Sequence, residues 1–146
     1  MSDETRIETE SEIDAYLAKL HYALSSGAKL MFQEVRKIDE SRNIKYSNKF
    51  TVADLFPNEN PIDALKRELS SLTKAEYLQT VKDIRFPKLS EMREFGRVYN
   101  ATAEVYIKIR VELLDVSSVG NHTTFVMSFH YSTIAFKDRH FPYCYK

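Results

Sequence analysis

The stretch EVYIKIRVEL, residues 104–113, decides the fold together with the run TTFVMSFH at residues 123–130. In the first run the apolar residues fall on every second position with polar residues between them, which is the period of a half-buried strand. Residues 117–122 have turn composition, because Gly120 and Asn121 both tolerate positive φ angles. The second run alternates again, so we predict a long β-hairpin.

The two faces of this hairpin differ in chemistry. We expect Phe125, Met127 and Phe129 to join the valines and isoleucines of the first strand on the buried face. The opposite face then carries a phenol, two cations, a hydroxyl and an imidazole. These side chains are Tyr106, Lys108, Arg110, Ser128 and His130. One face is therefore predicted to form the core, and the other to carry the chemistry.

Composition limits the class of protein. The chain has 146 residues, of which 43% are hydrophobic, enough for one domain with its own core. It contains no run of about 18 apolar residues and its N-terminus is acidic, so we expect a soluble cytoplasmic protein without a signal peptide or membrane span. The single cysteine, Cys144, excludes an internal disulfide and a multi-cysteine zinc site. The formal net charge is zero, which counts against an RNA enzyme because each neutralised phosphate adds affinity.

The order of the predicted elements indicates an α+β domain. We expect an acidic flexible arm at residues 1–11 and a single domain at 12–146. The domain is predicted to contain a helix at 12–24, a short strand or second helix at 29–37, a helix opening at Thr51, a helix capped by Asn60 and opened by Pro61, a helix from Thr73 to Lys82 or Arg85, a strand near 96–99 and the hairpin. Helices come first and consecutive strands follow, so the N-terminal helices should pack on one face of a mostly antiparallel sheet.

Motifs for most catalytic chemistries are absent from the sequence. It has no glycine-rich phosphate loop, no His-Glu-x-x-His and no Gly-x-Ser-x-Gly elbow, and its four histidines lack metal-ligand spacing. What remains is the polar hairpin face and the basic residues that precede it, which are Lys82, Arg85, Lys88, Arg93 and Arg97. Such a set suits metal-free RNA cleavage, which needs a base, an acid and fixed cations facing the phosphorane. A histidine such as His130 exchanges protons near neutrality.

Three segments resemble the MqsR family of bacterial toxins. They are LTKAEY at 72–77, EVYIKIRV at 104–111 and VMSF at 126–129, and a looser likeness extends over residues 12–131. The resemblance implies a RelE-like α/β fold and an endoribonuclease that needs no metal or cofactor. It also implies two partners, mRNA and a cognate antitoxin protein.

The resemblance also implies a site. Tyr106 matches the family's strand tyrosine, His130 stands where the family has a lysine, Arg93 stands where it has a glutamine, and Gln79, with Lys82 nearby, stands where it has another lysine. We therefore expect Tyr106, His130, Arg93 and Lys82 to be catalytic, and Gln79, Lys108 and Arg97 to bind substrate. In this hypothesis Arg93 and Lys82 hold the scissile phosphate, His130 transfers a proton, and Tyr106 orients or deprotonates the attacking 2′-hydroxyl.

Each of these residues also has a purely structural interpretation. Tyr106 on a sheet face is often a packing residue, His130 is often a hydrogen-bonded structural histidine, and Lys108 fits a cross-strand ion pair. Phe141, Tyr143 and Tyr145, in the tail that has no family counterpart, fit base stacking, a C-terminal strand or a cap on the core. The alternative function is a noncatalytic RNA- or protein-binding module, for example a phage-encoded inhibitor.

Overall fold

The computed structural model describes residues 4–27, 29–34, 43–113 and 122–144. Within these residues the elements are β1 (Glu4–Arg6), α1 (Glu10–Ser25), β2 (Lys29–Phe32), the 3-10 helix η2 (Ile44–Tyr46), α2 (Asn48–Leu55), α3 (Pro61–Leu69), the 3-10 helix η3 (Lys74–Glu76), β3 (Tyr77–Lys82), β4 (Met92–Tyr99), β5 (Ala103–Leu113), β6 (His122–Tyr131) and the 3-10 helix η4 (Phe136–Asp138). This confirms an α+β domain. No helix in the described part combines the length and apolar character needed to cross a membrane.

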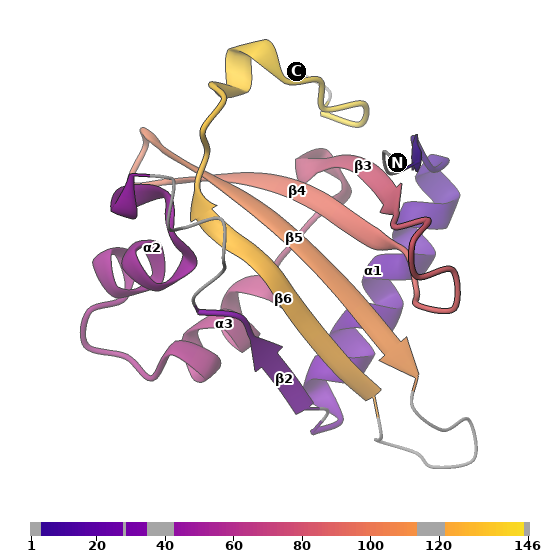
Figure 1. Ribbon diagram of the computed structural model, residues 1–146, viewed down its shortest axis with the longest axis horizontal. Helices are drawn as coiled ribbons and strands as arrows, with labels where there is room; N and C mark the ends of the chain where they lie inside the picture. Colours follow the sequence, from indigo (N-terminus) through magenta and orange to yellow (C-terminus); the bar gives the residue numbers. More distant parts are fainter. Residues whose placement is uncertain (1–3, 28, 35–42, 114–121, 145–146) are drawn as a thin grey trace.

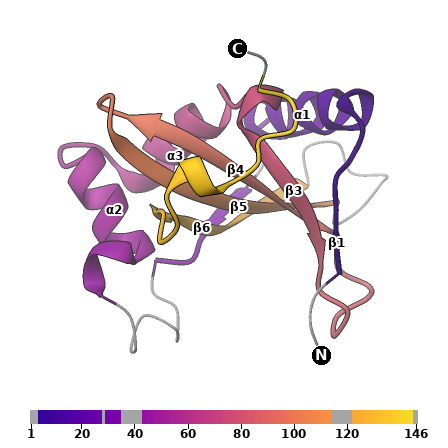
Figure 2. The ribbon, with the colours of Figure 1, turned by 90° about the horizontal axis from the view of Figure 1, so that it is seen from above.

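The strands form one open sheet in the order β1-β3-β4-β5-β6-β2. Every neighbouring pair is antiparallel except β2 and β6, which run parallel. Helices α1 and α3 lie on the same side of the sheet, behind the strands in Figure 1 and along one side in Figure 2. Their apolar residues, among them Ile13, Leu20 and Leu65, form one buried cluster with Ile107 and Ile109 of β5. The predicted packing of helices on one face is confirmed for these two helices, and we call the other side the open face.

The antiparallel pairing of the two predicted hairpin strands is confirmed, but a bulge interrupts their register. The predicted turn at residues 117–122 lies, except for His122, outside the described residues. Lys108 of β5 pairs with Ser128 of β6, whereas the next residue, Ile109, pairs with Val126. Met127 is therefore an extra residue on β6, and such a residue shifts the alternation of faces along its strand.

The bulge changes which side chains of β6 are buried. Phe129 is fully buried as predicted, but Val126 takes the next core position. Phe125 lies on the open face, where the guanidinium carbon of Arg110 is 4.6 Å from its ring centroid. Phe125 and Met127 are only half-buried, so their predicted place in the core was wrong. Strict alternation cannot be extended through a bulge.

Helix α2 lies along the part of β6 that β2 leaves uncovered. The side-chain amide of Asn48 donates to the carbonyl of Met127 at 3.0 Å and accepts from the amide of Phe129 at 3.0 Å. The hydroxyl of Thr51 accepts from the amide of Tyr131 at 3.0 Å. Side chains of α2 thus take the place of a neighbouring strand and satisfy an otherwise open sheet edge. The helix begins at Asn48, earlier than the predicted opening at Thr51.

The helix predicted from Thr73 to Lys82 or Arg85 is not present. The predicted capping box does form, since Glu76 accepts from the backbone amide of Thr73 at 2.9 Å. It supports only the single turn of η3, after which Tyr77 begins strand β3. The β-pairing of β3 with β1 and β4 overrides the local helical signal.

The N-terminal segment also differs from the flexible arm expected at residues 1–11. Residues 4–6 form the edge strand β1, and Glu8 is 4% exposed. Helix α1 begins at Glu10 with a capping box between Thr9 and Glu12. Residues 4–11 are therefore part of the folded domain.

Candidate functional site

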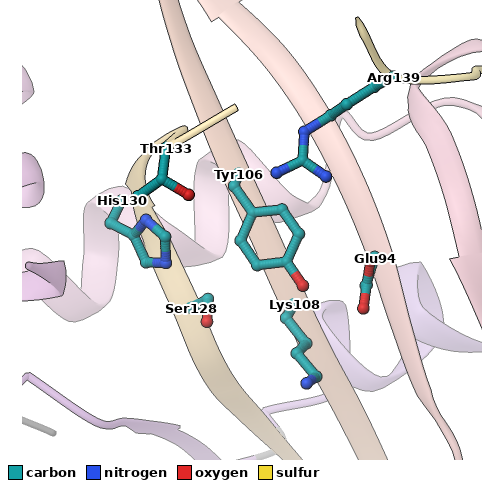
Figure 3. Close-up of a pocket in the computed structure, with 7 residues that line it drawn as sticks. All are labelled: Glu94, Tyr106, Lys108, Ser128, His130, Thr133 and Arg139. Atoms are coloured by element: carbon teal, nitrogen blue, oxygen red, sulfur yellow. The ribbon is translucent and has the colours of Figure 1, made fainter. Parts of the chain in front are cut away.

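A hollow of about 240 Å³ lies on the open face of the sheet. Its lining combines side chains from β4, β5, β6 and the segment that follows β6 (Figure 3). They are Glu94, Tyr106, Lys108, Ser128, His130, Thr133 and Arg139. Strands β5 and β6 direct alternate side chains to this face, so the hairpin that forms the core also forms the floor of the hollow.

Tyr106 and His130 stand side by side in the hollow. They are direct cross-strand partners in β5 and β6, and their ring centroids are 5.4 Å apart at an interplanar angle of 42°. Figure 3 shows both rings directed into the same space, with the hydroxyl of Ser128 below His130. The structure thus brings together the phenol and the imidazole that the sequence placed on one face.

The backbone fixes the orientation of the His130 ring. Its Nδ1 lies 2.9 Å from the carbonyl oxygen of Tyr131. A carbonyl oxygen only accepts, so Nδ1 carries the proton in this bond, and in the neutral ring Nε2 is the basic nitrogen. The side chain is only 5% exposed. An imidazole held in one tautomer and one orientation is suited to proton transfer through Nε2.

Two cations and one carboxylate give the hollow a mixed charge. Arg139 lies over Tyr106, with its guanidinium carbon 5.0 Å from the ring centroid, and Lys108 enters from β5. Glu94 on β4 is 7% exposed and accepts a hydrogen bond from the side-chain amide of Gln79 at 3.1 Å. Gln79, predicted to bind substrate, therefore lies on the open face and holds the one carboxylate of the hollow.

Arg93, predicted to hold the phosphate, lies on the opposite face. It pairs with Ile109 of β5, which points into the core. Its guanidinium donates to both carboxylate oxygens of Glu8, at 2.9 and 3.0 Å, and its carbon lies 4.4 Å from the ring centroid of Tyr16. This geometry does not bring Arg93 to the hollow as predicted, because the sheet lies between them.

Arg97 is likewise on the helix side, since it pairs with the core residue Val105. It donates to both carboxylate oxygens of Glu76, at 2.6 and 2.9 Å, and to the carbonyl of Ser71 at 2.7 Å. These bonds join β4 to η3 and the end of α3. The structure therefore does not bring Arg97 into the hollow with Tyr106 and His130.

Lys82 serves the loop between β3 and β4. Its Nζ donates to the carbonyl oxygens of Pro87 and Leu89 at 2.9 and 2.6 Å, and it does not line the hollow. Of the four residues predicted to be catalytic, the structure thus brings together Tyr106 and His130 only.

Arg139 and Glu94 were missed from the sequence. For Glu94 a signal was present, because Phe95 is an evident core residue and strand alternation then puts Glu94 on the other face and Arg93 on the core side. For Arg139 there was none, since its approach to Tyr106 depends on how the segment after β6 folds back.

No group of three or more His, Cys, Asp or Glu side chains in the described ranges is arranged to hold a metal ion. Comparison of the chain with protein-family models, with curated proteins and with solved structures finds no match.

Proposed function

We propose that this chain is a metal-independent endoribonuclease that cleaves mRNA, the RelE-like toxin of a bacterial toxin–antitoxin pair akin to the MqsR family. The observation that carries the proposal is the Tyr106–His130 pair, with ring centroids 5.4 Å apart in a hollow that two cations line. The α+β fold and the resemblance of residues 72–77, 104–111 and 126–129 to that family agree with it.

The hollow offers the groups that such a cleavage needs. Nε2 of His130 takes the proton of the ribose 2′-hydroxyl as its oxygen bonds to phosphorus, and the bond from phosphorus to the 5′-oxygen breaks. The phenol of Tyr106 gives a proton to the leaving 5′-oxygen, and solvent returns the proton from His130 to Tyr106 after the products leave. The products are a 2′,3′-cyclic phosphate and a 5′-hydroxyl. Lys108 faces the charge that develops on the phosphorane.

Glu94 favours a second candidate, a noncatalytic RNA- or protein-binding module. Its carboxylate lines the hollow and opposes a phosphate there. Such a module keeps Lys108 for binding and needs no proton transfer by Tyr106 or His130. The two candidates differ in whether bound RNA is shortened.

The test is cleavage of a labelled mRNA by purified protein in EDTA, with mapping of the fragment ends. We expect fragments with 2′,3′-cyclic phosphate and 5′-hydroxyl ends, and Tyr106→Phe and His130→Gln should each slow cleavage roughly 100-fold or more. Tyr22→Phe is the matched control, because Tyr22 is 52% exposed on α1, away from the hollow. Circular dichroism verifies that each variant folds.

Two results would overturn the nuclease proposal. One is intact RNA after incubation with wild type, and the other is wild-type cleavage by both site variants. Retention of full-length RNA in a low-salt gel shift, lost as salt rises, would establish the binding module instead. For the toxin–antitoxin assignment, induction should arrest bacterial growth, and co-expression of the protein encoded by a neighbouring reading frame should restore it.

A further inference from the structure

The segment after β6 is anchored to the sheet along its length. We call residues 132–144 the C-terminal strap, which runs over the upper end of the sheet in Figure 1. The backbone amide of Phe136 donates to the carboxylate of Glu104 at 3.0 Å. Farther along, the ring of Tyr143 stacks on Tyr77 with centroids 6.1 Å apart and 12° between the planes, and its hydroxyl donates to the carbonyl of Glu8. These contacts join the strap to β5, β3 and the N-terminal segment.

The middle of the strap rests on a glycine. Phe136 and Phe141 pack edge to face, and a Cβ at Gly96 would come within 2.8 Å of one ring and 2.9 Å of the other. Any larger residue there would push both rings away. Gly96 is the cross-strand partner of Tyr106, so the position where the strap rests is directly beside the proposed site.

The strap carries Arg139 between these two aromatic anchors. Its Nε and Nη2 donate to the hydroxyl of Ser132 at 3.3 and 3.2 Å, and its guanidinium lies over the ring of Tyr106. Figure 3 shows that the guanidinium group approaches Tyr106 from the side away from His130. A planar guanidinium with five N–H donors matches the oxygens of a phosphodiester better than an ammonium does.

We infer that Arg139 is the arginine that binds the scissile phosphate, and that the C-terminal strap is therefore part of the active site. This inference rests on the proposed function. The predicted clamps, Arg93 and Lys82, are engaged elsewhere by Glu8 and by loop carbonyls, whereas Arg139 and Lys108 line the hollow. Arg139 lies on the opposite side of Tyr106 from His130. From this position its guanidinium can hold a phosphate against the rings of Tyr106 and His130.

The first experiment compares single-turnover RNA cleavage by wild type, Arg139→Gln and Arg139→Lys. Removal of one preorganised charged donor should slow the step at saturating enzyme about 100-fold, and lysine should restore part of the rate. The control is Lys137→Gln, two positions away on the strap, which removes an exposed charge that does not line the hollow. It should cleave like wild type.

A second variant tests the strap without touching a charge. Gly96→Ala should displace Phe136 and Phe141, move Arg139 and slow cleavage at least tenfold. Its unfolding midpoint should show that the variant is still folded under the conditions of the cleavage assay. Should Gly96→Ala fail to fold, Arg139→Gln still decides the question, because the Arg139 side chain is partly exposed and its hydrogen bonds are to Ser132, outside the buried core.

The failure of this inference differs from the failure of the proposed function. Cleavage by Arg139→Gln at the wild-type rate would remove Arg139 from the site and leave the nuclease intact. Where wild type cleaves no RNA, the readout is binding of a single-stranded 2′-deoxy oligonucleotide. About tenfold weaker binding by Arg139→Gln, with a smaller salt dependence, would support a phosphate contact by Arg139 even then. Equal binding by the variant, or no binding by either protein, would overturn it.

Discussion

The buried ion pair between Arg93 and Glu8 gives the most direct test of which arginines are structural. Their side chains are 15% and 4% exposed, and the guanidinium makes both of its hydrogen bonds to the carboxylate at 3.0 Å or less. The hydroxyl of Thr80 donates to the same carboxylate at 2.7 Å, and the phenol of Tyr77 lies 2.7 Å from that hydroxyl. The pair therefore joins β4, β3 and the segment before α1.

Replacement of Arg93 by Met removes the two shortest charged hydrogen bonds of the buried Glu8 carboxylate, which keeps only a longer bond from Arg6 at 3.2 Å and the bond from Thr80. Breaking one partner out of a buried pair costs about 3 to 5 kcal/mol, a large share of the roughly 5 to 15 kcal/mol that stabilises a domain. The double variant Glu8→Gln with Arg93→Met keeps neither charge, so its loss of stability should be smaller than that of Arg93→Met alone.

The pH dependence of stability follows from the same contacts. Burial by itself raises the pKa of Glu8, but the hydrogen bonds from Arg93 and Thr80 outweigh burial, and the net pKa is lowered. A carboxyl group whose pKa is lowered in the folded protein stabilises the fold at pH values above the ordinary glutamate pKa of about 4.3. That contribution disappears as the pH falls through the native pKa. In Glu8→Gln, the free energy of unfolding should therefore fall less steeply than in wild type as the pH drops below about 5.

Urea denaturation followed by circular dichroism measures these changes at pH 7 and in steps down to pH 3. Cleavage by Arg93→Met, measured where the variant is still folded, should stay within a few-fold of wild type. If Arg93→Met lost less than about 1 kcal/mol of stability but no longer cleaved RNA, this account would be contradicted. That result would indicate that Arg93 binds the phosphate.

Four further outcomes are expected. Asn48→Ala should cost about 3 kcal/mol in urea denaturation, because it leaves buried backbone groups of β6 without partners, whereas exposed Lys49→Ala should change stability little. Arg97→Leu should cost about 2 kcal/mol by the same measurement, since Glu76, which is 22% exposed, loses the two hydrogen bonds that it accepts from Arg97. RNA cleavage should proceed equally in EDTA and in magnesium; dependence on a divalent ion would refute the proposed chemistry. The logarithm of the affinity for single-stranded RNA should fall against the logarithm of salt concentration with a slope near −1.4, about two phosphate contacts, and a slope near zero would exclude phosphate binding by Lys108 and Arg139.

Local signals in the sequence were reliable where the structure is local. Asn60 followed by Pro61 predicted the start of α3, and the Asn60 side chain accepts from the amides of Ile62 and Asp63 at 3.0 and 3.2 Å. The hairpin of β5 and β6 followed in the same way from alternation. The capping box at Thr73 was equally real but was confined to one turn, because the residues after it pair with β4 and with β1, which is far away in the sequence.

The division of side chains between the two faces was harder to predict, because it depends on register. A shift of one residue exchanges the faces of a strand. On β4 that single step decides whether Arg93 or Glu94 enters the hollow, and the family resemblance pointed to Arg93, although the alternation around Phe95 favours Glu94. On β6 the bulge at Met127 moved Phe125 to the open face but left His130 in place, because His130 lies beyond the bulge in register with Tyr106.

The zero net charge of the chain does not argue against a phosphate site once the charges are placed in the structure. On the helix side and along the edge beside β1, arginines are matched by carboxylates: Arg93 contacts Glu8, Arg6 contacts Glu91, and Arg97 contacts Glu76. These pairs contribute no net charge and little field at a distance. The hollow instead contains two cations and one carboxylate, so its local balance is positive within the reach of a bound phosphate. Affinity for RNA depends on the charges near the bound phosphates rather than on the sum over the chain, and it is this local excess that Arg139 creates.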